Sequence, residues 1–230
     1  MIPPWRRVLV PGLSTLAMLV VLIGLGTWQV QRLHWKEDVI AAIAIAEASP
    51  PIALSHDPQP FTKVFATGRF QFDRAAHLGA EVRDLRTGPT LGTYQIVPLI
   101  RDNAPPIMVN RGWAPQTRTL SLDEPSGLVT VSGYVREGDR PSWFSAADDV
   151  PARQFYTLDP RAIGVAVGVT NAEPFVLVAL EPSRPGAFPE PAQQLPRPPN
   201  NHLAYVITWY GLALALVAIF AVWTRKALRS

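Results

Sequence analysis

The chain lacks cysteine entirely and has only four histidines among its 230 residues. Without thiolates it can form neither disulfides nor the zinc and iron–sulfur sites that depend on them. No two histidines stand three or four residues apart, so the sequence gives no support for a zinc-binding helix. The fold must therefore rest on the burial of apolar side chains and on hydrogen bonds.

Motifs of several enzyme classes are also missing. The sequence contains no Gly-x-Ser-x-Gly nucleophile turn and no Gly-rich phosphate loop ending in Gly-Lys-Ser/Thr. We interpret the adjacent acids Asp148 and Asp149 as a solvated loop rather than a metal site. The absence of a visible catalytic constellation argues against an enzyme, although catalytic groups can be scattered along a chain.

Charge is absent from two long stretches, Val8–Val30 and Leu203–Trp223, which hold no Asp, Glu, Lys or Arg in 23 and 21 residues. At about 1.5 Å per residue, each helix would cover the roughly 30 Å hydrocarbon core of a bilayer. The sequence therefore predicts transmembrane helices at 8–30 and 203–223, with the lipid bilayer as a partner. Within the first of them, we interpret Gly24 and Gly26 as close-packing positions.

The two tails, residues 1–7 and 224–230, carry only basic charges, whereas all 18 acidic residues lie between positions 31 and 202 with 16 of the 21 bases. Short basic flanks stay cytoplasmic, so we expect both termini inside and the central domain in the periplasm of a bacterial inner membrane. The pI near 9.5 then reflects topology and indicates no nucleic-acid partner. The first span is too long for a signal peptide and lacks a small-residue cleavage site, so we expect it to be retained.

The central region changes from helical to β periodicity. A helical neck is predicted at 31–49, a β domain at 50–181 and an extended return linker, with seven prolines between 182 and 199, at 182–202. Short runs rich in Val, Ile, Phe, Tyr and Thr predict a mostly antiparallel sandwich or barrel. One short helix is expected at 159–167, capped by Asp159. The predicted strands are 61–72, 75–84, 93–100, 107–113, 128–137, 153–158 and 175–180, separated by loops that include 86–89 and 103–106.

Polar and aromatic side chains gather at the outer ends of both predicted spans. His202, Tyr205 and Trp209 open the second span, and seven residues return a helix to nearly the same face. Trp28, Gln29 and Arg32 lie at the same boundary of the first span and its neck. A neutral imidazole can ligate haem iron, and Arg32 could pair with a propionate. An ordinary aromatic belt at the membrane surface explains the same residue types.

Four sequence blocks, taken together and in order, resemble the surfeit locus protein 1 family across essentially the whole chain. The blocks are Gly26–Lys36 (GTWQVQRLHWK), Gly92–Leu99 (GTYQIVPL), Val109–Pro115 (VNRGWAP) and Asn201–Trp209 (NHLAYVITW). In the third block, we interpret Gly112 as allowing a close backbone approach and Trp113 as filling the core or touching lipid.

The resemblance implies a non-enzymatic assembly factor for haem–copper terminal oxidases, especially cytochrome c oxidase. Bacterial members look like carriers that bind haem a as cargo and help deliver it to oxidase subunit I; haem a synthase is a further candidate partner. The family's proposed iron ligand falls on His202, with Trp209 in the same block and Trp28, Gln29 and Arg32 in the first. Two alternatives stay open: an oxidase-assembly scaffold that holds no haem, and a periplasmic sensor or enzyme domain on a membrane hairpin.

Overall fold

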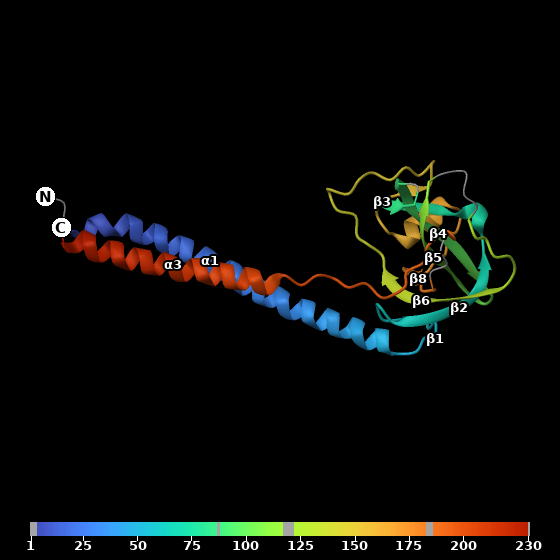
Figure 1. Cartoon of the computed structure of the whole chain (residues 1–230), viewed down its shortest axis with the longest axis horizontal. Coiled ribbons are helices and arrows are strands. Elements are labelled where there is room, and N and C mark those ends of the chain that lie inside the picture. Colours follow the sequence, from blue (N-terminus) through green and yellow to red (C-terminus); the bar gives the residue numbers. More distant parts are fainter. Residues whose placement is uncertain (1–3, 87, 117–121, 183–185, 230) are drawn as a thin grey trace. The chain divides into compact units, whose positions relative to one another are not determined.

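A computed structural model describes residues 4–86, 88–116, 122–182 and 186–229. The chain forms two compact units, one built from its two ends, up to Ala42 and from Arg197 onward, and one from Ile43–Pro196. In chain order, one long apolar helix precedes and another follows a mostly β domain with one short helix, as the sequence predicts (Figure 1).

The helical unit is made by α1 (Pro4–Ala48) and α3 (His202–Arg229). The first helix continues without a break from the predicted span into the predicted neck, so the neck is helical as expected. Both helices are long and apolar enough to cross a membrane, with mean hydropathies of 2.4 and 2.2 in their most apolar windows.

The two helices lie side by side and run antiparallel (Figure 1). A Cβ atom placed on Gly12 would contact Phe220, and one placed on Gly26 would contact Tyr210, so early positions of α1 face late positions of α3. Leu22, Gly26 and Gln29 are buried on α1 at the three- and four-residue spacing of a left-handed helix pair.

Glycine explains how closely the two helices approach each other. An added Cβ on Gly26 would lie 2.9 Å from the Tyr210 ring, whereas one on Gly24 would meet nothing within 4 Å. Small residues along the line of contact between two membrane helices, here called the seam, let the helices pack closely. The close-packing prediction is therefore confirmed for Gly26 and wrong for Gly24, which points away from the seam.

The β domain contains eight strands among the described residues, in the order β1-β2-β6-β8-β5-β4-β3-β7. An additional antiparallel pairing of β2 with β4 joins β2, β6, β8, β5 and β4 into a ring. All seven predicted strands are present, and the two-residue strand β1 is an addition. The strand bounds are Ile52–Ala53, Lys63–Phe70, Ala76–Leu85, Gly88–Arg101, Ala104–Pro115, Val129–Glu137, Gln154–Phe155 and Phe175–Ala179 for β1 to β8.

The main core of the domain lies where the five ring strands face one another. Each of these strands contributes at least one apolar side chain that is at most 6% exposed. Burial of such apolar surface is the main favourable term in the stability of a domain without disulfides. The core residues are Val64, Ala66, Leu99, Ile107, Val109, Val131, Val135, Phe175, Leu177 and Ala179.

Two predicted loops are shorter than expected. The segment 103–106 was expected to be a loop, but β5 begins at Ala104 and takes in both following prolines. Asn103 adopts a positive φ of 61°, which completes a tight turn, and the Pro105 carbonyl accepts two hydrogen bonds from Arg101. Likewise, β4 already begins at Gly88, while Thr87 of the predicted loop 86–89 lies outside the described residues.

The short helix α2 (Pro160–Ala166) forms as its capping sequence predicts. The Asp159 carboxylate accepts hydrogen bonds of 3.0 Å from the backbone N–H groups of Arg161 and Ala162. Those donors have no partner within the helix, so the cap satisfies them.

Described parts of the proline-rich segment pack on the β domain. Glu190 exchanges two backbone hydrogen bonds with Trp113, of 2.7 and 3.0 Å, and Phe188 and Leu195 are buried. Gly112 has a φ of +116°, and a Cβ there would lie 1.9 Å from the Glu190 carbonyl oxygen. The close approach expected at Gly112 and the core position expected for Trp113, which is fully buried, are both observed.

Candidate functional site

The six predicted site residues all belong to the helical unit, three on α1 and three on α3. The structure distributes them between two environments. Gln29 and His202 meet in the seam between the helices, and Trp209 follows on the same side of α3. Trp28, Arg32 and Tyr205 lie on outward surfaces of the pair.

A hydrogen bond joins the two helices at the start of α3. The Nδ1 atom of His202 lies 2.7 Å from the Oε1 atom of Gln29. Gln29 is only 8% exposed, so this contact is screened little by solvent. An amide oxygen can only accept a hydrogen bond, so the neutral tautomer that fits this contact carries its proton on Nδ1 and its lone pair on Nε2.

A second cross-helix contact, absent from the sequence prediction, lies within one turn of the first on α1. The Thr27 hydroxyl donates to the Ile23 carbonyl at 2.9 Å and accepts from the Tyr210 hydroxyl at 3.1 Å. These bonds fix Tyr210 over Gly26. A glycine next to a threonine at a predicted span end was the available signal, because that pairing favours close approach and interhelical hydrogen bonding.

Trp209 carries an unused hydrogen-bond donor. Its Nε1 atom is buried and has no partner among the described residues. An indole N–H in a buried position usually finds an acceptor. Trp209 stands seven residues after His202, so it lies on nearly the same face of α3, about 10 Å further along the axis.

The remaining predicted residues are open to the surroundings of the helix pair. Trp28 and Tyr205 are 51% and 53% exposed. The Arg32 guanidinium stacks on the exposed Trp35 ring, with its Cζ atom 4.2 Å from the ring centroid. Exposed aromatic rings and a stacked arginine also suit the interfacial region of a bilayer.

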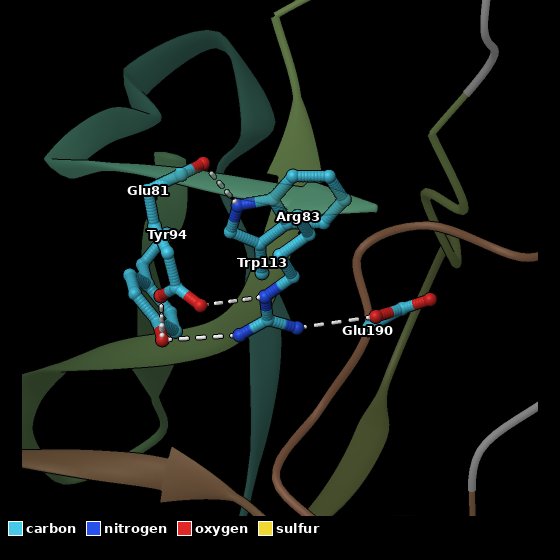
Figure 2. Close-up of polar contacts among 5 residues, drawn as sticks. All are labelled: Glu81, Arg83, Tyr94, Trp113 and Glu190. Atoms are coloured by element: carbon cyan, nitrogen blue, oxygen red, sulfur yellow. Dashed lines mark hydrogen bonds and ion pairs between the residues drawn. The ribbon is translucent and has the colours of Figure 1, made fainter. Parts of the chain in front are cut away.

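The β domain has its own polar cluster, shown in Figure 2. Arg83 donates to Glu81 at 2.8 Å, to Glu190 at 3.1 Å and to Tyr94 at 3.1 Å, and the Tyr94 hydroxyl donates to Glu81. The Trp113 indole N–H donates to the Glu81 carbonyl. The cluster borders a hollow of about 410 Å³.

This cluster is arranged to hold the proline-rich segment rather than to move protons. Hydrogen bonds from Arg83 and then Tyr94 lower the pKa of Glu81 below its usual range. Burial, helped by the bond to Glu81, raises the pKa of Tyr94. Both shifts lead away from neutral pH, opposite to the tuning that a general acid or base needs. The arrangement therefore fits a structural role, in which Arg83 holds Glu190 of the proline-rich segment against the β domain.

No metal-binding group of three or more His, Cys, Asp or Glu side chains occurs among the residues that the structure describes. The Asp148 and Asp149 carboxylates instead accept hydrogen bonds from the backbone N–H groups of Tyr156 and Ala152. The solvated-loop interpretation of these acids is confirmed, since both are exposed.

Comparisons with known proteins find similar sequences along nearly the whole chain. The model of the SURF1 family matches residues 16–214. The chain is 29% identical to a SURF1-like protein of Monosiga brevicollis over 93% of this chain and 87% of that protein. It is also 29% identical to a SURF1-like protein of Rickettsia bellii, over 93% and 90% of the two chains. It is 28% identical to Surfeit locus protein 1 of Homo sapiens over 98% and 77%.

Proposed function

Because the chain belongs to the SURF1 family, we propose that it is an assembly factor for haem–copper terminal oxidases that carries haem a to oxidase subunit I. The observation that carries the proposal is the bond between Gln29 and His202, which leaves the Nε2 lone pair of His202 available to iron. The haem is cargo, so the protein binds and releases it without catalysing a reaction.

The proposed setting is the bacterial inner membrane. α1 and α3 would cross the bilayer, which is supported by their length and hydropathy. The basic tails would lie in the cytoplasm and the β domain in the periplasm, following the distribution of Lys and Arg. In this topology, His202 and Gln29 lie at the periplasmic boundary, where an apolar macrocycle can reach them from the lipid.

The chain's own residues would each contribute a different contact. His202 would hold the iron through Nε2, and the free Trp209 N–H would donate to a polar substituent at the ring edge. Trp28 and Tyr205 offer exposed aromatic surface, and Arg32 can neutralise a propionate. Apolar burial of the macrocycle contributes about 25 cal/mol per Å² before the costs of binding. A site that stays partly open allows the cargo to be handed on to subunit I; haem a synthase is the candidate source.

The test is a comparison of His202→Ala with His34→Ala in protein purified in detergent from cells that make haem a. His34 is an exposed histidine on the same helix as Gln29, so its replacement controls for the loss of an imidazole. We expect a haem a absorption spectrum in the wild type and in His34→Ala, and loss of most of it in His202→Ala. Unchanged haem content in a folded, membrane-inserted His202→Ala protein would refute the ligand assignment.

A scaffold that docks on nascent subunit I without holding haem is the second candidate. It is favoured by the adjacent aromatic rings of Trp143 and Phe144, which are 88% and 77% exposed on a loop of the β domain. Large exposed aromatic surface is typical of protein-binding patches. Stable co-purification with the oxidase, with no haem in any variant, would favour this candidate.

A further inference from the structure

The contact between Gln29 and His202 has an unusual combination of features for a residue at a helix end. The Gln29 side chain is long and polar, yet it is buried in the seam of an apolar helix pair. Its Oε1 atom is 2.7 Å from His202 Nδ1. A polar group held in apolar surroundings is costly unless it is satisfied, so a partner with fixed geometry is required.

We propose that Gln29 is a positioning residue that sets the tautomer and the ring orientation of His202. This inference rests on the proposed function of His202 as the ligand of haem iron and deepens it. An acceptor on Nδ1–H keeps the lone pair on Nε2, restricts rotation of the ring and makes Nε2 more basic. Gln29 thus prepares the ligand from the opposite helix before any haem arrives.

Several polar groups near His202 are engaged elsewhere, while the buried Oδ1 atom of Asn200, two residues before it, has no partner among the described residues. The Thr27 hydroxyl donates to the Ile23 carbonyl and accepts from the Tyr210 hydroxyl. Arg32, one turn after Gln29, is stacked on Trp35 and could not accept a proton in any case. Among the described residues, Gln29 is the side chain within hydrogen-bond distance of the His202 ring, and its Oε1 atom can act there only as an acceptor.

The first measurement needs no haem. In full-length protein labelled with ¹⁵N-histidine in detergent, nitrogen chemical shifts distinguish the two neutral tautomers, and His202→Ala identifies the His202 signals. We expect the Nδ1–H tautomer in the wild type. We expect Gln29→Met, which keeps the length but has no strong acceptor, to show a substantial population protonated on Nε2. Gln31→Met is the matched control, because Gln31 is exposed on the same helix.

The second measurement adds ferric haem a to the same variants. Loss of an outer partner of a metal-bound histidine weakens metal affinity by about 10- to 100-fold, and we expect a decrease of that size in Gln29→Met. The iron–histidine stretching frequency of the reduced complex should fall in Gln29→Met. Gln29→Glu, which supplies a carboxylate acceptor, should restore both the tautomer and the stretching frequency.

The outcomes separate the two proposals. Wild-type tautomer, affinity and iron–histidine frequency in a folded Gln29→Met protein would overturn the positioning role while leaving His202 as the ligand. Wild-type haem affinity in His202→Ala would overturn the proposed function, whatever tautomer Gln29 imposes. A loss of affinity in Gln29→Met without a change of tautomer or frequency would also overturn the inference, because it would indicate general damage to the helix pair.

Discussion

The helical unit and the β domain each contain a cluster of polar and aromatic side chains, but the two clusters differ in how completely their hydrogen bonds are made. In the β domain, Arg83 engages three partners at once, and both acidic partners are compensated by it. In the helical unit, Trp209 has a buried N–H without an acceptor among the described residues. His202 uses only Nδ1 in the described contacts.

This difference separates a structural role from a binding role. A saturated cluster has little to gain from a ligand, because each new bond must replace an existing one. An unsaturated cluster still has bonds to make, and a ligand that supplies them is bound more tightly for that reason. We therefore propose the helix pair as the binding site and the β domain as a rigid support or docking body.

The largest expected effect is on the free energy of unfolding of the β domain. Gly112→Ala should destabilise it by about 3–5 kcal/mol, because Ala resists a φ of +116° and its Cβ would lie 1.9 Å from the Glu190 carbonyl oxygen. Gly127→Ala is the control: it has a φ of +82° but open space around it, so only the backbone cost of about 1–2 kcal/mol remains. Denaturant unfolding of the full chain in detergent measures both.

Equal losses in the two variants would contradict the interpretation that Glu190 packs tightly against Gly112. We expect the proposed haem binding by the helix pair to be unchanged in any Gly112→Ala protein that remains folded. A loss of haem affinity in a Gly112→Ala protein whose β domain is still fully folded would show that the two units depend on each other.

Local patterns in the sequence were sufficient for the helices and for every strand except the two-residue β1. β-branched and aromatic runs located the seven strands, and Asp159 followed by Pro160 located the start of α2. Pairings between distant segments were not predictable in the same way. The β2–β4 closure and the docking of Glu190 on Trp113 join residues far apart in the chain, and no local period encodes which partner is chosen.

The candidate site shows the same limit. Residue types and helical spacing placed His202 and Trp209 on one face of α3, and both are half-buried. The sequence could not say that Gln29 points inward while Trp28, its neighbour, is half exposed. That distinction depends on the rotation of α1 about its axis, which is set by packing of Gly26 against Tyr210.

The second prediction concerns the packing of α1 against α3 and leaves the β domain unchanged. Gly26→Ala should cost about 1–3 kcal/mol of helix packing, because its Cβ would lie 2.9 Å from the Tyr210 ring. Gly24→Ala should have no such cost, since nothing lies within 4 Å. The chain has no native thiol, so spin labels on Leu16→Cys and Leu214→Cys, both exposed, report the distance between the helices directly.

A longer or broader distance in Gly26→Ala, with Gly24→Ala unchanged and the unfolding of the β domain unaffected, is the expected pattern. We also expect weaker haem binding in Gly26→Ala, because Gln29 lies one turn from the displaced residue. Identical distances in both variants would mean that Tyr210 can move aside, and the seam would then be looser than its geometry indicates.

The smallest expected effect tests whether the β-domain cluster is saturated and structural. Arg83→Met removes three donors but keeps apolar contact with the Trp113 ring, which lies 5.0 Å from the guanidinium carbon. We expect a loss of about 1 kcal/mol at neutral pH, at the low end for charged hydrogen bonds because the side chains are partly exposed. Arg69→Met removes a more exposed ion pair with Asp102 and should change stability by less than about 0.5 kcal/mol.

The pH dependence of the stability difference between wild type and Arg83→Met tests whether charge is responsible for it. The hydrogen bonds from Arg83 and Tyr94 lower the pKa of Glu81 in the folded protein, so the stabilisation is complete above the unfolded pKa and disappears as pH falls through the folded pKa. In Arg83→Met the carboxylate loses its main partner, so wild type and variant should converge on acidification. If the stability difference between wild type and Arg83→Met stayed constant down to acidic pH, the effect of Arg83 would come from its packing on Trp113. Glu190 would then be held by apolar contacts rather than by charge.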